Sequence, residues 1–325
     1  MKNILKRNKN IFLLFFFLIF LLFFDLIFTK YKYTHTFFVE RNQTLNQITT
    51  NLYKEKIIDN KFFFKFLIFS SLSQKVLKAG EYEFYNNNIF EIIRKIRVGD
   101  VYQRRITVPE GLTSNEIIDI IKKTEGIVLN QEGFKEIVEE GTLFPSTYFY
   151  VYGTNSNIII NNMKKRMQST LIEAWKNRDK DLDINNHKDV VILASIIEKE
   201  SSLNSEKSKI AQVFLNRLRL NMKLQSDPTV IYGIERELGI KKKELTKNDL
   251  NHESSFNTYL VHGLPESPIC NPGKESIIAA TNPSKGDLLF FVANGEGGHN
   301  FSSSYDEHIE NVKKFRELQG GVYEN

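Results

Sequence analysis

An apolar run near the N-terminus is the strongest constraint on how this chain can fold. Ile11–Phe28 reads IFLLFFFLIFLLFFDLIF, in which Asp25 is the one charged residue. As a helix rising 1.5 Å per residue it would be roughly 27 Å long, close to the bilayer hydrocarbon core of about 30 Å. Asp25 lies near the far end, where it can reach the interface at moderate cost. A helix buried in a protein core is the alternative, but so apolar a run between basic flanks favours a transmembrane helix.

The basic residues on either side of this run predict its orientation. Lys2, Lys6, Arg7 and Lys9 precede it, and Lys30 and Lys32 follow it. The N-terminal excess predicts a cytoplasmic N-terminus and a single pass through the cell inner membrane, with the remainder periplasmic or otherwise extracytoplasmic. A cleaved signal peptide is the alternative, but no small-x-small site follows the run. We therefore expect an uncleaved anchor that contacts the lipid bilayer through Ile11–Phe28.

Length and composition limit the remaining possibilities. The 325 residues suggest two or three domains, and 41% apolar residues supply material for their cores. A net charge of +5 is modest and does not argue for a nucleic-acid partner. The one cysteine, Cys270, excludes an intramolecular disulfide and leaves the compartment open. HExxH, CxxC and phosphate-binding glycine motifs are absent, so neither a metal nor another cofactor is expected.

The segment after the run predicts a small mixed module. No proline occurs before Pro109, and apolar residues at 45, 48 and 52 share one helical face. Phe37–Val39 and Glu81–Tyr85 are predicted to be short strands. Leu45–Tyr53, Lys61–Phe69 and Phe90–Val98 are predicted to be helices. We expect a module with its own small core within residues 31–150.

A second apolar run, Asp189–Ser201, reads DVVILASIIEKES and ends in two glutamates. At the helical period Leu193, Ile196 and Ile197 form one stripe, and Glu200 continues it. Glu198 lies about 200° away around the helix, since residues two apart do not face each other. The run breaks immediately afterwards, which puts Glu200 in the last turn.

Three effects favour the protonated form of Glu200. Its apolar neighbours desolvate it, the negative end of the helix dipole opposes its charge by roughly 0.3–1 kcal/mol, and no basic residue shares its face within the helix. A glutamic acid that stays neutral near pH 7 is suited to act as a general acid. The alternative is that the Glu-Lys-Glu sequence is a solvated helix end, because glutamate is mostly exposed in proteins.

The next segment predicts an amphipathic helix followed by a loop. Ile210, Val213, Phe214, Arg217 and Leu218 form its apolar face. Arg217 could hold a carboxylate, Glu198 or Asp227, or its stem could simply cover the core. Because Asp227 precedes a proline, it and Gln225 are expected in a loop, where both could contact sugar hydroxyls.

The chain from Pro228 to Pro283 is expected to be rich in loops. It holds Tyr232, Asn257 and Tyr259, and sugar sites use such aromatic faces and amide groups, although the combination is common in loops. Leu288–Val292 is predicted to be a strand that a turn at 294–299 pairs with the residues that follow. His299, at the end of this turn, is a further candidate for substrate contact.

Five stretches resemble the membrane-anchored endolytic murein transglycosylases, the MltG or YceG-like family. They are ILASIIEKES, VFLNRLRLNMKLQSDPTVIYG, FNTYLVHGLP, NPGKESIIAATNP and LFFVANGEGGHNFS. They occur in the family's order and cover roughly Phe144–Phe301, about half of the chain. The resemblance implies a catalytic glutamate within an E-K-E-[ST] motif, which corresponds to Glu200 here.

The resemblance also implies an α+β architecture in three parts. Residues 1–30 would form the cytoplasmic tail and the transmembrane anchor, and residues 31–150 a LysM-like module that contacts glycan or serves as a spacer. Residues 151–325 would form a lysozyme-like helical catalytic domain with a β-rich insertion. Helices at 190–201 and 206–219 are expected to pack against each other. The supporting positions, if they form one site, are Glu198, Gln225, Asp227, Tyr232, Asn257, Tyr259 and His299.

The implied reaction is a peptidoglycan lyase reaction on nascent strands that terminates their elongation. Glu200 would protonate the β-1,4 oxygen between N-acetylmuramic acid and N-acetylglucosamine, then act as base on the muramoyl C6 hydroxyl to close a 1,6-anhydro ring. Peptidoglycan synthases are candidate partners. One alternative is a hydrolytic muramidase that uses Asp227 or Glu198 as a second carboxylate. Another is a scaffold without catalysis that binds peptidoglycan or division proteins.

Overall fold

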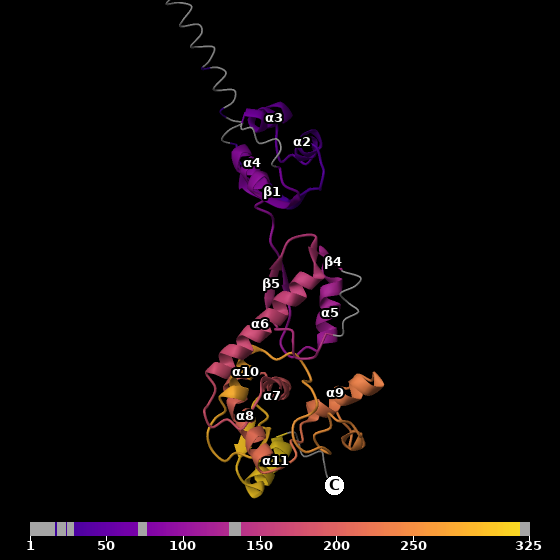
Figure 1. Cartoon of the computed structure of the whole chain (residues 1–325), viewed down its shortest axis with the longest axis vertical. Helices are drawn as coiled ribbons and strands as arrows, with labels where there is room; N and C mark the ends of the chain where they lie inside the picture. Colours follow the sequence, from indigo (N-terminus) through magenta and orange to yellow (C-terminus); the bar gives the residue numbers. More distant parts are fainter. Residues whose placement is uncertain (1–16, 18–23, 25–28, 71–76, 130–137, 319–325) are drawn as a thin grey trace, which may run out of the picture. The chain divides into compact units, whose positions relative to one another are not determined.

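The computed structural model describes residues 29–70, 77–129 and 138–318, together with Phe17 and Phe24 (Figure 1). Contacts divide the chain into two compact units. The described residues up to Arg105 join Phe149–Thr154 in the first, and Ile106–Tyr148 join the described residues from Asn155 onward in the second. The expected anchor at 11–28 lies outside the described residues except for those two phenylalanines. Within the described part of the chain, no helix combines the length and apolar character needed to span a membrane.

The described residues of the first unit form two strands and three helices. Its elements are β1 (Tyr31–Val39), α2 (Leu45–Lys54), α3 (Lys61–Ser70), β2 (Gly80–Asn87) and α4 (Ile89–Val98). The two strands form an antiparallel ribbon in which Phe37 lies opposite Tyr82 and Tyr31 opposite Asn87. Phe37, Tyr82 and Phe64 of α3 are almost fully buried and form the centre of the core. All five predicted elements of this module are confirmed.

Local sequence explains where the helices of this unit begin. Thr44 caps α2 and Asn88 caps α4, and in each case the residue three positions later, Gln47 or Glu91, returns a bond to the cap backbone. Such reciprocal capping satisfies two of the amide groups that a helix start leaves without partners. Gly99 ends α4 in the left-handed region, at φ 77°, a conformation that glycine adopts at little steric cost.

The elements after α4 are short strands and mostly longer helices. They are β3 (Arg104–Thr107), α5 (Ser114–Lys123), β4 (Ile127–Val128), β5 (Thr147–Tyr150), β6 (Thr154–Asn155), α6 (Ser156–Lys176), α7 (His187–Glu200), α8 (Asn204–Arg219), α9 (Asp227–Leu238), a 3-10 turn (Asp249–Asn251), α10 (Lys274–Thr281), β7 (Phe290–Ala293), β8 (His299–Ser302) and α11 (Tyr305–Leu318). The chain is therefore α+β, as predicted.

Helix α7 is the centre of the second unit. Every residue from Val190 to Ile197 is buried, and the helix contacts α6, α8, α9 and α10 (Figure 1). A helix that is apolar on every side is stable only when other elements enclose it. The predicted packing of 190–201 against 206–219 is confirmed, because α7 and α8 are in contact and share one core.

Of two predictions for the C-terminal part, one is confirmed and the other is wrong. The predicted hairpin is confirmed, since β7 and β8 pair antiparallel with Phe291 opposite Phe301. The predicted loop at Asp227 is wrong, because Asp227 is the first residue of α9. Proline is tolerated in the first turn of a helix, where its missing N–H would have no partner within the helix. Gln225 does lie in the link before α9, at φ 51°.

Candidate active site

The carboxyl group of Glu200 lies where the buried helix α7 meets the start of α9. Ser201 ends α7 in an extended conformation, and Leu193, Ile196 and Ile197 of the same face are fully buried. Glu200 itself is only partly exposed. The Ser226 hydroxyl donates a short hydrogen bond to Oε1 of Glu200. The helical period therefore placed Glu200 correctly at the end of the buried stripe.

Ser226 occupies the N-cap position of α9, yet its side chain makes no capping bond. Serine is common at this position because its oxygen usually accepts from the first turn, but here the hydroxyl serves Glu200 instead. The Ser226 amide donates to Oγ1 of Thr258 at 2.9 Å, and Oγ1 of Thr229 donates to the Ser226 carbonyl at 2.7 Å. The two threonine hydroxyls are 2.9 Å apart, and all three residues are buried. Ser226 is thus held firmly against Glu200.

The surroundings of Glu200 raise its pKa from the ordinary value of 4.5 to about 7. Burial is the main cause, and the nearby charge of Asp227 acts in the same direction. The hydrogen bond from Ser226 and the positive charge of Arg217 oppose the rise. A carboxyl balanced in this way exists in both protonation states near neutral pH, so it can give up a proton and later take one back.

Two of the predicted supporting residues lie close to Glu200. The Tyr259 hydroxyl donates to Oδ1 of Asp227 at 2.6 Å. Burial, this bond and then the charges of Asp227 and Glu200 raise the pKa of Tyr259, which keeps the phenol protonated. The Gln225 side chain is exposed, and its backbone amide donates to the Thr258 carbonyl at 3.1 Å. Asp227 and Tyr259 therefore lie beside Glu200, and Gln225 lies in the link that leads to Asp227.

Among the described residues Arg217 donates to carbonyl groups and not to a carboxylate, so of the two possibilities for this side chain the pairing with Glu198 or Asp227 is not formed. Its Nε donates to the Leu289 carbonyl at 2.7 Å and its Nη1 to the Leu224 carbonyl at 2.7 Å. Burial lowers the pKa of Arg217, while Tyr259 and Glu200 act to raise it. The guanidinium therefore joins the link before α9 to the residue that precedes β7, and its charge lies close to Glu200.

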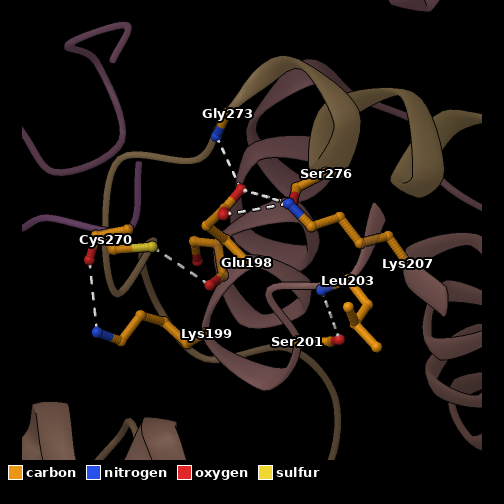
Figure 2. A network of polar contacts seen from close by, with 10 residues as sticks. Glu198, Lys199, Ser201, Leu203, Lys207, Cys270, Gly273 and Ser276 are labelled. Atoms are coloured by element: carbon orange, nitrogen blue, oxygen red, sulfur yellow. Dashed lines mark hydrogen bonds and ion pairs between the residues drawn. The ribbon is translucent and has the colours of Figure 1, made fainter. Parts of the chain in front are cut away.

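Glu198 leaves α7 in another direction and is enclosed by donors (Figure 2). Its carboxylate accepts from Nζ of Lys207 at 3.2 and 3.3 Å, from the Gly273 amide at 2.9 Å and from the Ser276 hydroxyl at 2.6 Å. The side chains of Lys207 and Glu198 are only 2% and 7% exposed. Glu198 thus fastens α7 to α8 and to the start of α10.

Glu110 is a further carboxyl that the sequence did not single out. A Cβ at Gly273 would lie 2.0 Å from its Oε1, so Glu110 can hold this position only while residue 273 has no side chain. Burial and then the charge of Glu198 raise the pKa of Glu110. The segment that begins at Pro109 is thereby packed against the same junction of α7 and α10.

The other predicted supporting residues have their polar groups occupied elsewhere. The Tyr232 hydroxyl donates to Oε2 of Glu140 at 3.3 Å. Asn257 is fully buried and donates to the carbonyls of Leu250 and His252. Nδ1 of His299 lies 2.7 Å from Oε2 of Glu206 and its amide donates to Oε1. These contacts fix loops and the hairpin.

Ser226 is the site residue that sequence reasoning missed. A serine just before Asp-Pro is a signal for a helix start, and reading it so would have put α9 in place and Ser226 beside the end of α7. Two surface hollows of this unit, one beside Asp179 and Arg219 and one beside Lys188 and Leu264, are lined by none of the candidate residues. In the described ranges no group of three or more His, Cys, Asp or Glu is arranged to hold a metal ion.

Comparison with known proteins adds to this geometry. A sequence model of the family described as YceG-like matches residues 37–314. A Bacillus subtilis protein named endolytic murein transglycosylase is 30% identical over 310 residues, which cover 85% of this chain and 83% of the relative. A Streptococcus pneumoniae protein of the same name is 26% identical, and the match covers 84% of this chain and 57% of the relative.

One solved structure is also similar. The crystal structure of a YceG-like protein from Listeria monocytogenes aligns with 86% of this chain and 99% of its own, at a TM-score of 0.52 and 30% identity. The similarity thus extends from the sequence to the fold and includes both units.

We predict that Glu198→Gln destabilises the second unit by about 3 kcal/mol, because it leaves the Lys207 charge buried without its partner. Glu198→Gln combined with Lys207→Met should recover most of the loss, since the uncompensated charge is then gone. Urea unfolding followed by Trp175 fluorescence measures this, as Trp175 is the one tryptophan and packs against the core of this unit. A single variant as stable as the wild type would contradict the prediction.

We also predict that Glu200 makes the folded state less stable as pH rises. Its pKa is higher in the folded chain than in the unfolded chain, so between about 4.5 and about 7 the folded state binds more protons. The free energy of unfolding should fall across this window relative to Glu200→Gln, by at most roughly 3.5 kcal/mol at about 1.4 kcal/mol per pKa unit. Urea titrations of both proteins at pH 4.5 and pH 8 test it. An unchanged difference between the two proteins would disprove it.

Proposed function

Because the chain belongs to the YceG-like family, we propose that it is a peptidoglycan lyase, an endolytic transglycosylase that cuts glycan strands internally. The relatives named endolytic murein transglycosylase support the reaction and its substrate. The observation that carries the assignment of the acid is the carboxyl of Glu200, which is held by Ser226 and has a pKa of about 7.

Glu200 acts first as an acid and then as a base. In its protonated form it donates to the oxygen that links N-acetylmuramic acid to N-acetylglucosamine, and the glycosidic bond breaks. The resulting carboxylate takes the proton of the muramoyl C6 hydroxyl, whose oxygen closes the 1,6-anhydro ring. No water is consumed, and Glu200 ends in its starting state. The pKa near neutrality supports both halves of the cycle.

Three neighbours support these two states. The Ser226 hydroxyl donates to the ionised carboxylate, and the charge of Arg217 favours that form. Asp227 favours the protonated form through its own negative charge. Tyr259, beside the acid, and Gln225, in the link before α9, are available to the sugar rings and their hydroxyls. The acetamido oxygen of the substrate is the candidate to stabilise the positive centre that develops at the anomeric carbon.

Asp227 is the residue on which the hydrolytic alternative depends. A hydrolase with two carboxylates would need Asp227 to activate water or attack the sugar. In this structure Asp227 already accepts from Tyr259 at 2.6 Å, which makes it a weaker base and nucleophile. Glu198 is enclosed by Lys207, Gly273 and Ser276 and has no free oxygen to offer. A single-acid lyase mechanism fits these contacts better.

We propose that the enzyme is anchored in the cell inner membrane through Ile11–Phe28 and acts outside the cytoplasm. The substrate supports this location, since peptidoglycan is extracytoplasmic. In the proposed division the first 30 residues are tail and anchor, residues 31–150 a LysM-like module and residues 151–325 the lysozyme-like catalytic domain with its β-rich insertion. Contacts such as the 2.7 Å bond from the Leu143 amide to Asn271 also attach the end of the middle part to the catalytic part. Peptidoglycan synthases are the proposed protein partners.

We expect Glu200→Gln to reduce glycan cleavage by about 10²–10⁴-fold or more, because positioned proton transfer contributes that much and this one residue performs two transfers. The amide has nearly the same shape, so the fold should survive. The measurement is the yield of 1,6-anhydro muropeptides by mass spectrometry from uncrosslinked glycan, with thermal melts to match folding.

Asp227→Asn is the matched control for that experiment, since it changes the neighbouring carboxylate in the same way. It should retain much more activity than Glu200→Gln. Near-normal activity of Glu200→Gln would show that Glu200 is not the catalytic acid. A product with a reducing end from the wild type would identify a hydrolase.

We expect Ser226→Ala to shift the alkaline limb of the pH profile. The limb should begin near pH 7, where Glu200 loses its proton, and removal of the hydroxyl raises its pKa further because the ionised form loses a donor. A bond to a charged group is worth about 1.5–3 kcal/mol, so the limb of kcat/KM should move up by about one to two pH units. Ser201→Ala is the control, since that hydroxyl contacts Leu203 and Glu206 and should leave the limb in place. A limb that Ser226→Ala leaves unmoved would exclude this role.

A further inference from the structure

Helix α3 in the first unit carries a row of exposed phenylalanines. Phe62, Phe66 and Phe69 are 87%, 64% and 51% exposed, and their spacing of four and three residues puts them on one side of the helix. Phe64 and Ile68, on the opposite side, are fully buried in the core of the unit. The helix is therefore apolar on both sides, although the unit covers only one of them.

The exposed apolar side continues towards α4 and has basic residues at its border. A groove between the two helices is lined by Leu67, Ser70, Phe90, Ile93, Arg94 and Arg97. On α4, Phe90, Arg94 and Arg97 again follow the spacing that puts them on one side. Phe90 is 46% exposed. We call Phe62, Phe66, Phe69 and Phe90 the phenylalanine surface. Beside it lie Lys65 of α3 and the two arginines of α4.

The chain enters this unit close to the phenylalanine surface. Only two residues separate the end of the apolar run 11–28 from β1, and two residues span at most about 7 Å. The first residue of β1, Tyr31, pairs with Asn87, immediately before the residue that caps α4. The pKa of Glu91 in the first turn of α4 is lowered by the Asn88 amide and also by the charge of Lys30. Lys30 and Tyr31 therefore lie near the N-terminus of α4, where Phe90 lies.

We propose that the phenylalanine surface inserts into the interface of an anionic lipid bilayer, so that the first unit rests on the membrane next to its anchor. This inference rests on the anchor in the proposed function. Exposed aromatic rings are stable at the boundary between headgroups and acyl chains, and lysine and arginine beside them attract anionic lipids. A glycan strand would need polar partners, and the four members of this surface are all phenylalanine. The short connection to the anchor keeps the surface within reach of lipid.

The test uses the full chain reconstituted in phosphatidylcholine vesicles with and without phosphatidylglycerol. Phe66→Cys carries a nitroxide label, and the native thiol of Cys270 is fully buried, so the introduced thiol is the one that reacts. Collision rates of the label with oxygen and with a water-soluble nickel chelate report its depth. Ile172→Cys is the matched control, because Ile172 is likewise apolar, helical and 52% exposed but lies in the second unit.

In anionic vesicles we expect the label at position 66 to collide several-fold more with oxygen, relative to the nickel chelate, than the label at position 172. Without phosphatidylglycerol this ratio should fall towards that of the control. Equal ratios at the two positions in anionic vesicles would overturn the inference. Spin–spin broadening at position 66 that disappears on dilution with unlabelled chain would also overturn it, since a second copy would then cover the surface. Nickel protection that appears only on addition of glycan would overturn it in favour of a glycan site.

Vesicle flotation and activity separate this inference from the proposed function. A chain that does not float with the vesicles overturns the anchor and this inference together. A chain that floats with position 66 in water overturns this inference alone. Anhydro-muropeptide formation, measured on the same vesicles, tests the lyase activity independently of both results.

Discussion

The burial of α7 on every side is the constraint on which the second unit depends. From Val190 to Ile197 the helix offers only apolar or small side chains, and four other helices enclose it. Its last three residues leave this enclosure in different directions. Glu198 meets a buried lysine, Lys199 reaches the Gly111 carbonyl at 3.4 Å, and Glu200 meets a serine hydroxyl. The position of the Glu200 carboxyl is thus a direct result of where the other helices cease to enclose α7.

The two glutamates show how partners decide the role of a carboxyl. Glu198 accepts hydrogen bonds from a lysine, a backbone amide and a hydroxyl. These donors belong to α8 and the start of α10, so the carboxylate holds both elements against α7. Glu200 receives one hydroxyl and lies among apolar atoms with an aspartate nearby. Residues two positions apart on one helix therefore act differently, the first as a structural fastener and the second as a group that can exchange its proton.

The spacing of apolar residues and the residues that mark helix ends predicted most of the helices and strands and the position of Glu200. Both are local properties of the sequence. The contacts made by side chains far apart in the sequence were not predictable in the same way. Ser226 is 26 positions beyond Glu200, and the carbonyl of Leu289 lies 72 positions beyond Arg217. Asp227 was predicted to lie in a loop because a residue before proline rarely has helical backbone angles. That prediction overlooked Ser226, which marks the start of a helix at Asp227. The roles expected of Tyr232, Asn257 and His299 came from composition, which does not say where a polar group finds its partner.

The bond from Arg217 to the Leu289 carbonyl also has a consequence for the order in which the molecule is completed. The link that carries Ser226 is joined through this guanidinium to the residue that precedes β7, near the end of the chain. Glu206 likewise receives the His299 amide from the hairpin. Contacts over such separations form late, since the chain between them must first be available. A chain whose last hairpin is not yet formed lacks these contacts around Glu200, the proposed acid, so this proposed site is completed only when the protein is nearly whole.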